Sequence, residues 1–347
     1  MSLKDVSDRL VLMGLSKYEA RAYAALLLYG PLTASEVASK ADIPQPRVYD
    51  VLNNLVDKGL VVVKEGQPKR YAPLGVQEAL SSYIRREVER LERLKDEIAS
   101  MLPSMQPPYT SEVGIWRSEG LSAALSMARD MMARSRYEVI VAGSWQLISS
   151  MLDDLKEAAR RGVSVGALVY GATKEALQDA DVEAFDEVRV TAWRGPAFVL
   201  LDQDSAVILA GAADPLHQPT GYLLSDRRLL PVIFDYVYRL REASDALKEL
   251  RAARGQVKTF AHMVRAVDYV SAAMSAGLRV SVEAEGVSVR DGSPVHVSGA
   301  VSSLGKDPLR GIYFIEVVGE GGSKVRLGGP EATYEDVRAL YLKVTVT

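Results

Sequence analysis

The chain has 347 residues, of which 48% are hydrophobic, and its formal net charge is −3. This length predicts two or three domains of roughly 100–200 residues each, and the apolar share predicts globular domains with buried cores. No stretch approaches the ~20 uncharged apolar residues of a transmembrane helix, and the start, "MSLKDVSDRLVLMG", lacks the apolar block of a signal peptide. We therefore expect a cytoplasmic protein without membrane contact.

The scarcity of three residue types narrows the chemistry. The chain has no cysteine, which excludes disulfides, thiolate metal sites and cysteine nucleophiles. Its histidines, His217, His262 and His296, lie far apart in the sequence, so we expect no metal, no cofactor and no Ser-His-Asp triad. The only asparagines are Asn53 and Asn54. Missing cysteine and scarce asparagine are typical of a heat-adapted source.

The charges are unevenly distributed along the chain. Residues 1–75 carry 10 Lys and Arg against 8 Asp and Glu, whereas residues 76–104 carry 5 against 6. The remainder of the chain is therefore acidic. A slightly basic N-terminal part on an acidic body is compatible with nucleic-acid binding by the N-terminal part alone.

Two capping boxes predict the first pair of helices. Ser16 and Glu19 have the spacing at which each side chain satisfies a backbone amide at a helix start, and helical periodicity then continues to Gly30. Thr33 and Glu36 repeat this spacing and open a second helix of about two turns.

A third helix is predicted over "IPQPRVYDVLNNLVDKG", residues 43–59. Pro46 suits the first helical turn, where its missing N–H costs nothing, and Gly59 suits the C-terminal end. One face of this helix is apolar and carries Val48, Val51, Leu52 and Leu55. The opposite arc and its flanks carry the polar residues and the aromatic Tyr49.

Two short strands follow the third helix. "LVVV" (60–63) and "KRYAP" (69–73) flank "KEGQP", which predicts a hairpin around a glycine-containing turn. Helix, short helix, helix and hairpin is the order of a winged helix-turn-helix, in which the third helix enters the major groove and the hairpin touches the DNA backbone or minor groove.

The expected DNA contacts come from the third helix and the hairpin. Gln, Arg and Asn side chains match purine edges, and exposed basic residues bind phosphate. The candidate DNA-binding residues are Gln45, Arg47, Tyr49, Asn53, Lys64, Lys69 and Arg70. Asp50 and Asp57 would repel phosphate, so contacts are expected mainly at the helix start. The alternative is a protein–protein module with a solvated polar face.

A long polar helix is predicted over residues 76–104. Its apolar residues recur by threes and fours, close to a heptad seam, between flanks rich in Arg and Glu. The seam residues are Leu80, Ile84, Val88, Leu91, Leu94 (or Lys95), Ile98 and Leu102. A coiled-coil homodimer is favoured because DNA-reading helices usually act in symmetric pairs, and packing of this helix against its own body is the alternative. "PSMQPPYTSEVG" (103–114) marks a domain boundary.

Residues 105–255 predict an α/β layer. "YEVIVAG" (137–143), a helix over roughly Ser144–Arg161 and "VSVGALVYG" (163–171) form a strand–helix–strand pattern. "VEAFDEVRVTAW" adds a strand, and "AFVLLDQDSAVILAG" adds a hairpin that turns at "DQD". "SDRRLLPVIFDYVYRLREA" returns to helix.

Residues 256–347 predict one more helix, over about 258–275, and then a small all-β lobe. The Val-rich runs after this helix are separated by Gly, Asp-Gly and Gly-Gly turns, a pattern typical of a sandwich or barrel. The predicted fold class is therefore multidomain α+β, with a winged helix-turn-helix, a coiled-coil helix, an α/β layer and a C-terminal all-β lobe.

The motifs also resemble the TrmB family of archaeal sugar-sensing transcriptional regulators. The resemblance rests on "GLSKYEARAYAALLLYG" and "PLTASEVA", on "IPQPRVYDVLNNLVDKGLV" and on the late "GGPEATYEDV". It implies a dimeric regulator that binds a double-stranded DNA operator through residues 1–75 and dimerises through 76–104. It also implies a phospholipase-D-like layer in 105–255 and a β-rich lobe in 256–347, which together bind a mono- or disaccharide effector.

The resemblance places the effector site in "LGGPEATYEDV". Family members hold sugar hydroxyls with a glycine and with a glutamate six residues later, and Gly329 and Glu335 keep that spacing. Such a glycine lets the ring approach and such a carboxylate accepts from two hydroxyls. The alternatives are that Gly328-Gly329 is only a hairpin turn and that Glu335 caps a short helix in "YEDVRAL".

Other positions of the effector site are less well matched. Ser225 corresponds to a sugar-contacting serine, with an N-cap of the following helix as the alternative. The family's sugar-binding asparagine has no counterpart, because no Asn follows Asn54. This leaves room for a ligand other than maltose or trehalose. Trp193 and Tyr222 would stack on a sugar or lie in the core.

The phospholipase-D likeness predicts a layer without catalysis. Active members need His-x-Lys-x4-Asp, and that spacing, ending on Asp202, places Gly195 at the histidine and Ala197 at the lysine. Glycine cannot replace a nucleophile. The competing readings are a phosphodiesterase or glycosidase with a DNA-binding anchor, using carboxylates such as Asp181, Asp186 and Asp202, and an architectural DNA-coating protein without an effector.

Overall fold

The structure, a computed structural model, describes residues 2–101, 113–211, 218–319 and 321–347. The chain divides into two compact units, Met1–Met105 and Gln106–Thr347. The seam residue Leu102 and most of the boundary expected at 103–114 lie outside the described residues.

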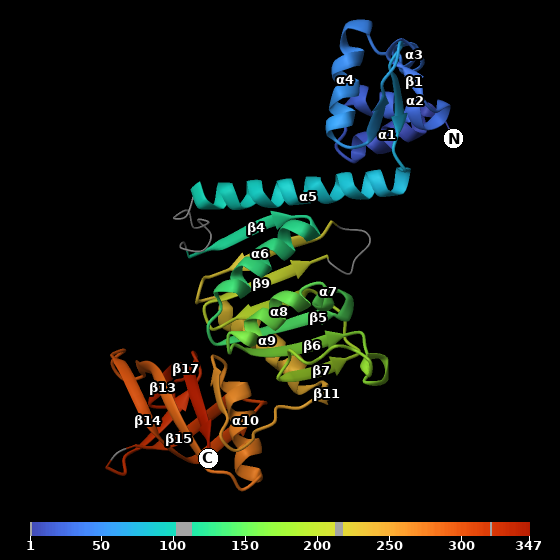
Figure 1. Ribbon diagram of the computed structural model, residues 1–347. Helices are drawn as coiled ribbons and strands as arrows, with labels where there is room; N and C mark the ends of the chain where they lie inside the picture. Colours follow the sequence, from blue (N-terminus) through green and yellow to red (C-terminus); the bar gives the residue numbers. More distant parts are fainter. Residues whose placement is uncertain (1, 102–112, 212–217, 320) are drawn as a thin grey trace. The chain divides into compact units, whose positions relative to one another are not determined.

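The first unit packs short helices around a small antiparallel sheet (Figure 1). The elements in chain order are α1 (Leu3–Leu12), α2 (Lys17–Tyr29), β1 (Leu32–Thr33), α3 (Ala34–Ala41), α4 (Gln45–Asp57), β2 (Val61–Lys64) and β3 (Arg70–Pro73). The strands lie in the order β1-β3-β2, and the helices share one buried core with them. The predicted succession of helix, short helix, helix and hairpin is confirmed.

Capping fixes where these helices begin. The Ser16 amide donates to Glu19 Oε2 at 2.9 Å and the Glu19 amide donates to Ser16 Oγ at 3.4 Å, which confirms the first predicted capping box. Thr33 and Glu36 form the second. The sequence reasoning missed α1, although its start has the same kind of box between Ser2 and Asp5.

Helix α5 (Val76–Met101) continues from the first unit's core. Ala79 and Tyr83 are buried in that core, and Arg86 donates a hydrogen bond to the Lys58 carbonyl. Beyond Tyr83 the seam residues Ile84, Val88, Leu91, Leu94 and Ile98 are 40–57% exposed. Among the described helices, α5 included, none combines the length and apolar character needed to cross a membrane.

The second unit begins with a mixed eight-stranded sheet in the order β11-β7-β6-β5-β8-β9-β10-β4. β5, β6 and β7 run parallel and the other pairings are antiparallel. The strands are β4 (Ile115–Glu119), β5 (Glu138–Ser144), β6 (Ser164–Tyr170), β7 (Glu187–Thr191), β8 (Ala197–Leu201), β9 (Ser205–Ala210), β10 (Thr220–Leu224) and β11 (Asp245–Lys248). The predicted hairpin that turns at "DQD" is confirmed as β8–β9.

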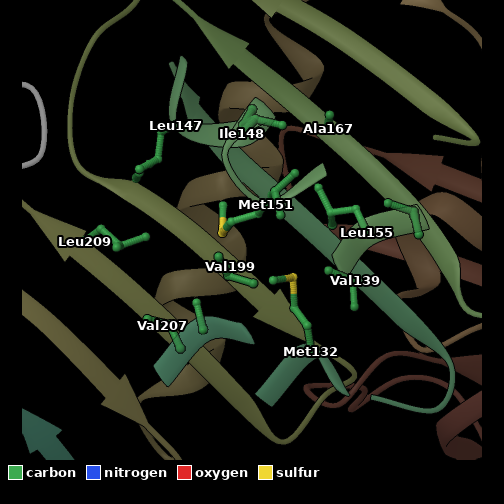
Figure 2. Packing of buried hydrophobic residues seen from close by; sticks show 14 of the residues in the cluster. Met132, Val139, Leu147, Ile148, Met151, Leu155, Ala167, Val199, Val207 and Leu209 are labelled. Atoms are coloured by element: carbon green, nitrogen blue, oxygen red, sulfur yellow. The ribbon is translucent and has the colours of Figure 1, made fainter. Parts of the chain in front are cut away.

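Helices cover both faces of this sheet. Successive strand residues point to opposite sides, so a strand such as β5 has apolar residues on both faces for these helices to cover. The helices are α6 (Leu121–Arg134), α7 (Trp145–Ser149), α8 (Leu152–Arg160) and α9 (Leu230–Glu242), with a 3-10 turn over Glu175–Leu177. Val139 and Val141 of β5 pack with α6, α7 and α8, as Figure 2 shows for Val139, whereas Ile140 and Ala142 pack with α9.

One expectation for this layer is wrong, and four of its elements were missed. The single helix expected over Ser144–Arg161 is wrong, because the chain leaves the helical conformation at Ser150-Met151 and forms α7 and α8 instead. This break places the Met151 side chain in the core, where it is 1% exposed. Elements β4, α6, β10 and β11 were not predicted from the sequence.

The remainder of the second unit is a β-rich lobe with one helix (Figure 1). Its strands lie in the order β12-β17-β13-β14-β15-β16, and a short parallel pairing of β16 with β17 closes the ring. The elements are β12 (Val257–Phe260), α10 (Met263–Ser275), β13 (Val280–Ser288), β14 (Pro294–Asp307), β15 (Ile312–Val318), β16 (Lys324–Gly328) and β17 (Val337–Val346). α10 packs its apolar side into this lobe's core.

Further expectations for this lobe need correction. The helix predicted over 258–275 begins only at Met263, because residues 257–260 pair as β12 with β17. The helix considered for "YEDVRAL" is wrong, because β17 begins at Val337. A hairpin turn at Gly328-Gly329 is also wrong, because β16 and β17 run parallel there.

Candidate functional site

Helix α4 separates a buried stripe from an exposed polar face. Val48, Val51, Leu52 and Leu55 are buried in the first unit's core, as their spacing predicts. The exposed residues of the same helix include Gln45, Arg47, Tyr49, Asn53 and Asn54. Pro46 lies in the first turn, and no side chain caps this helix start; the Arg47 amide donates to the Pro44 carbonyl at 2.9 Å.

Two contacts orient the start of this face. Gln45 Nε2 lies 3.3 Å from Ser35 Oγ of α3. The Arg47 guanidinium carbon lies 5.7 Å from the ring centroid of Tyr18 on α2, a cation–π distance. Both side chains are therefore held by neighbouring helices while they remain exposed.

The hairpin adds exposed positive charge to the same unit. Lys64 of β2 and Arg70 of β3 are directly opposite in register, and both are exposed. Lys69 pairs with Glu65, with 3.0 Å between Nζ and Oε2. An exposed pair of this kind contributes ~0–1 kcal/mol and exchanges readily for another anion.

The second unit contains a cavity of about 620 Å³ between α9 and the β-rich lobe. One wall is α9, with Phe234, Tyr238 and Glu242. The other walls are the start of α10, the β14–β15 turn, Tyr313 at the start of β15 and the β16–β17 loop. We call this cavity the ligand pocket. Its size and its aromatic and polar lining fit a small organic ligand.

The structure brings Gly329 and Glu335 together in this pocket. A Cβ on Gly329 would lie 3.7 Å from Met263 Cβ, an ordinary contact, whereas a Cβ on Gly328 would lie 2.8 Å from Glu335 Cγ. A Cβ on Gly328 would also lie 2.6 Å from Ala332 Cβ, so the packing of Ala332 and Glu335 requires a glycine at position 328, a distinction that the spacing could not reveal.

Ser225 and the two aromatic candidates lie elsewhere. Ser225 Oγ accepts from the Gly114 amide at 3.1 Å, and among the described residues it is not part of the pocket lining. The N-cap alternative for Ser225 is wrong, because Leu229 precedes α9. Trp193 packs edge-on against Tyr170, with 4.9 Å between ring centroids, and neither Trp193 nor Tyr222 lines the pocket.

The charges of the pocket are predominantly acidic. Arg239 is paired with Asp235 at 2.7 Å, and Arg310 is paired with Asp307 at 3.1 Å. Glu331 and Glu335 line the pocket and have no ion pair within the described part of the chain. An anionic ligand would therefore meet unbalanced carboxylates.

His262 is a pocket residue that the sequence reasoning missed. It is 2% exposed, and its ring packs T-shaped against Phe234 and Tyr238 at centroid distances of 5.0 and 5.5 Å. Burial, together with the nearby Arg265 guanidinium, lowers the pKa of His262 to about 3, so the imidazole is neutral. The signal in the sequence that could have drawn attention to His262 is that the chain has only three histidines.

An ionic network of buried and half-buried charges adjoins the pocket. Arg265, fully buried, pairs with Glu138 of β5 and, at 3.2 Å, with Glu187 of β7. Arg241 of α9 pairs with the same Glu187 at 2.7 Å. The network is completed by Asp268, Lys306 and Glu242. It joins the sheet layer to the β-rich lobe.

Asp202, which stands at the aspartate position of the His-x-Lys-x4-Asp spacing, has a structural role. It lies in the β8–β9 turn with φ of 48°. Its carboxylate accepts hydrogen bonds from the Ser135 hydroxyl and from the amides of Arg136, Tyr137 and Glu138. Ala197 is buried at the start of β8. These contacts secure the α6–β5 connection.

Three family models match the chain along most of its length. The model of the sugar-specific transcriptional regulator TrmB matches residues 10–77. The model of the N-terminal subdomain of the TrmB effector-binding domain matches residues 114–248. The model of the C-terminal subdomain of the TrmB/TrmBL1 effector-binding domain matches residues 256–347.

Curated relatives carry the same family names. The HTH-type transcriptional regulator TrmBL2 of Pyrococcus furiosus is 32% identical over 165 residues, covering 45% of this chain and 62% of the relative. The match therefore spans less than two thirds of that relative. The sugar-sensing transcriptional regulator TrmBL1 of the same organism is 23% identical over 340 residues, covering 96% of each chain.

Among solved structures, the archaeal chromatin protein TrmBL2 covers 71% of this chain at 23% identity, with a TM-score of 0.43. A phospholipase D family member, Nuc from Salmonella typhimurium, covers 40% of this chain at 11% identity, with a TM-score of 0.32.

Proposed function

Because the chain belongs to the TrmB family of transcriptional regulators, we propose that it binds a double-stranded DNA operator and that a mono- or disaccharide in the ligand pocket changes its affinity for that operator. The proposal of DNA binding rests on the exposed polar residues at the start of α4. A saccharide can act only by binding the DNA-competent and DNA-incompetent states with different affinity.

α4 is the proposed major-groove helix. Gln45, Arg47, Tyr49 and Asn53 occupy its exposed side, and each good bidentate contact to a base contributes ~1–3 kcal/mol of discrimination. Lys64, Lys69 and Arg70 of the hairpin are the proposed phosphate contacts, which set register and orientation without reading sequence. Residues 1–75 form the DNA-binding domain in this proposal.

Helix α5, within residues 76–104, is the proposed homodimerisation helix. Its seam residues after Tyr83 are exposed, and burying each Leu or Ile against a second copy is worth ~1.5–3 kcal/mol. A coiled-coil partner is the usual way to cover such a seam, and a symmetric pair of α4 helices would read two half-sites.

The ligand proposed for the pocket is an uncharged saccharide. Glu335 supplies acceptors for vicinal hydroxyls, and Tyr313 and Phe234 supply flat apolar surface. Glu331 and Glu335 disfavour a sugar phosphate, because the pocket arginines are already paired. Residues 105–255 and 256–347 together build this site, since α9 and the β-rich lobe each provide a wall.

The sheet layer of residues 105–255 is proposed to be phospholipase-D-like in descent and non-catalytic. Gly195 and Ala197 stand where an active member needs histidine and lysine, and Asp202 is engaged by backbone amides. A DNA-binding regulator that works on the chromosome would be cytoplasmic in an archaeal cell.

An architectural DNA-binding protein is the second candidate, because relatives named TrmBL2 match 45% and 51% of this chain and so leave about half of it unmatched. The match to the TrmB/TrmBL1 subdomain over residues 256–347 and the 96% coverage of TrmBL1 favour sensing. Footprinting separates the two: a regulator protects discrete sites, whereas a coating protein protects DNA uniformly.

Replacing Arg47 with Ala tests the proposed binding of DNA by α4. A duplex selected from a random pool by the wild-type protein should bind Arg47→Ala ~10–100-fold more weakly, as loss of a bidentate base contact implies. Asn54→Ala, on a residue aimed less directly from the same helix, is the matched control. Equal affinity of wild type and Arg47→Ala contradicts the proposal.

Replacing Leu91 with Glu tests the homodimer. Light scattering coupled to gel filtration should report a dimer for the wild type and a monomer for Leu91→Glu, whereas Arg93→Glu, on the outward side of the same turn, should remain dimeric. A wild-type monomer at micromolar concentration removes this part of the proposal.

A further inference from the structure

Two polar side chains of the ligand pocket come from different lobes and lie near each other. Glu242 is the last residue of α9, Tyr313 is near the start of β15, and both line the pocket. Tyr313 is directly opposite Lys306 in the β14–β15 register, and Lys306 Nζ lies 3.2 Å from Glu242 Oε2. Because directly opposed residues of neighbouring strands have adjacent side chains, Tyr313 and Glu242 are both next to Lys306.

The Tyr313 hydroxyl is free and accessible. It has no hydrogen-bond partner within residues 2–101, 113–211, 218–319 and 321–347. Five side-chain atoms of these residues are unpartnered and shielded from solvent, Tyr238 Oη among them, but Tyr313 Oη is not one of the five. The Tyr313 side chain is only half-buried. A molecule in the pocket can therefore reach its hydroxyl.

The Glu242 carboxylate is held in place and can still accept hydrogen bonds. Its Oε1 lies 2.9 Å from Arg241 Nη1, and its Oε2 pairs with Lys306. Its side chain is 23% exposed. A carboxylate has about four lone-pair sites, so these two contacts leave room for a donor from a ligand.

The surroundings keep the Tyr313 hydroxyl protonated. Burial and the carboxylates of Glu242 and Asp268 raise the pKa of Tyr313 to about 12. The phenol therefore donates a hydrogen bond, whereas Glu242 accepts one. A sugar hydroxyl both accepts and donates, so its chemistry matches the two side chains together.

We propose that Tyr313 and Glu242 form a second recognition point for the saccharide, at which one sugar hydroxyl accepts from the Tyr313 hydroxyl and donates to the Glu242 carboxylate. This inference rests on the proposed saccharide sensing, in which Glu335 binds other hydroxyls. Since Glu242 belongs to the ionic network, the bound sugar is anchored to the charges that join the sheet layer to the β-rich lobe.

Isothermal titration of the full-length protein with glucose, maltose, trehalose and sucrose tests this pair. For a sugar that binds the wild type, Tyr313→Phe should raise Kd about five- to tenfold, the usual effect of one neutral hydrogen bond. Glu242→Gln should raise Kd at least as much, because a charged acceptor makes the stronger hydrogen bond. The unliganded melting temperature of Tyr313→Phe should not fall, because the lost hydroxyl had no partner.

Monodeoxy analogues of the sugar that binds identify the recognised hydroxyl. One analogue should bind the wild type about five- to tenfold more weakly than the parent sugar, yet bind Tyr313→Phe as tightly as the parent sugar does. A purely structural effect of the substitution would not depend on which hydroxyl is missing. Tyr222→Phe is the matched control, since Tyr222 is half-buried in the same unit outside the pocket, and it should leave Kd unchanged.

The possible failures are distinguishable. If Glu335→Gln weakens binding but Tyr313→Phe does not, the recognition pair is overturned and the proposed function stands. The pair is also overturned if every missing hydroxyl weakens binding to the wild type and to Tyr313→Phe by the same factor. If none of the four sugars binds the wild type, saccharide sensing is contradicted and the pair falls with it.

Discussion

Two neighbouring regions of the second unit treat buried polar groups in opposite ways. In the ionic network every charge has a partner, from fully buried Arg265 to half-exposed Lys306. Among the residues that line the ligand pocket, which shares Glu242 with the network, Tyr238 and His262 each keep a buried, unpaired atom that is not exposed to the pocket. Glu331 and Glu335 have no ion pair within the described part of the chain. Complete pairing is typical of a structural junction, and incomplete pairing beside a cavity is typical of a binding site.

Arg265→Met should show the largest effect, because it leaves Glu138 and Glu187 buried with less compensation. Removing one partner of a buried pair costs ~3–5 kcal/mol of unfolding free energy. Urea denaturation followed by tryptophan fluorescence reports on the second unit, since Trp116, Trp145 and Trp193 all lie there.

The matched control for Arg265→Met is Arg160→Met. Arg160 pairs with Glu157 on the surface of α8 at 2.7 Å, and such a pair contributes ~0–1 kcal/mol. Equal losses of unfolding free energy in Arg265→Met and Arg160→Met would contradict the distinction between the buried ionic network and a surface ion pair.

His262→Phe should change the pH dependence of stability. The folded pKa of His262, about 3, lies below the unfolded value near 6.5, so the unfolded state binds more protons between these values. Wild-type stability therefore falls as pH decreases from ~6.5 toward ~3, by up to ~1.4 kcal/mol per pH unit from this group.

The variant lacks this penalty, so its unfolding free energy relative to wild type should rise steadily below pH 6.5 in parallel urea titrations. A constant difference across pH 4–7 would mean that His262 is solvated and is not a buried pocket group.

Lys306→Met should have the smallest effect on the unfolding free energy. It tests whether the exposed edge of the ionic network contributes as much as its buried centre. Lys306 is 36% exposed at its side chain, and Asp268 and Glu242 keep Arg241 as a partner. We expect a loss of ~1 kcal/mol or less in the same urea assay, as for other exposed pairs. A loss as large as that of Arg265→Met would extend the structural junction to the surface.

The parts of the fold that the sequence predicts well are locally determined. The capping boxes at Ser16 and Thr33, the apolar stripe of α4 and the β8–β9 turn each depend on residues within a few positions. The elements predicted wrongly depend on distant partners. Residues 257–260 become a strand because β17 pairs with them, and the break after α7 accompanies the burial of Met151 in the sheet's core.

The candidate site divides in the same way. The exposed face of α4 follows from helical periodicity, so its residues were identifiable. Gly329 and Glu335 were found only through the family resemblance. Tyr238 and His262 are 24 positions apart on elements of different lobes, and no periodicity links them. The tight packing of Gly328 against Glu335 likewise depends on the β16–β17 crossover.

The central claim is that occupancy of the ligand pocket changes DNA binding. The most direct measurement is the Kd for the selected duplex, determined by fluorescence anisotropy with and without a saturating sugar that calorimetry shows to bind the wild type. The measurement is made on the wild type and on Glu335→Gln. The account predicts that the sugar shifts the wild-type Kd by ~5–150-fold, the usual range of allosteric coupling. It also predicts that Glu335→Gln binds the free duplex like wild type but needs far more sugar to respond. A sugar that binds the protein and leaves the wild-type Kd for DNA unchanged would contradict the account.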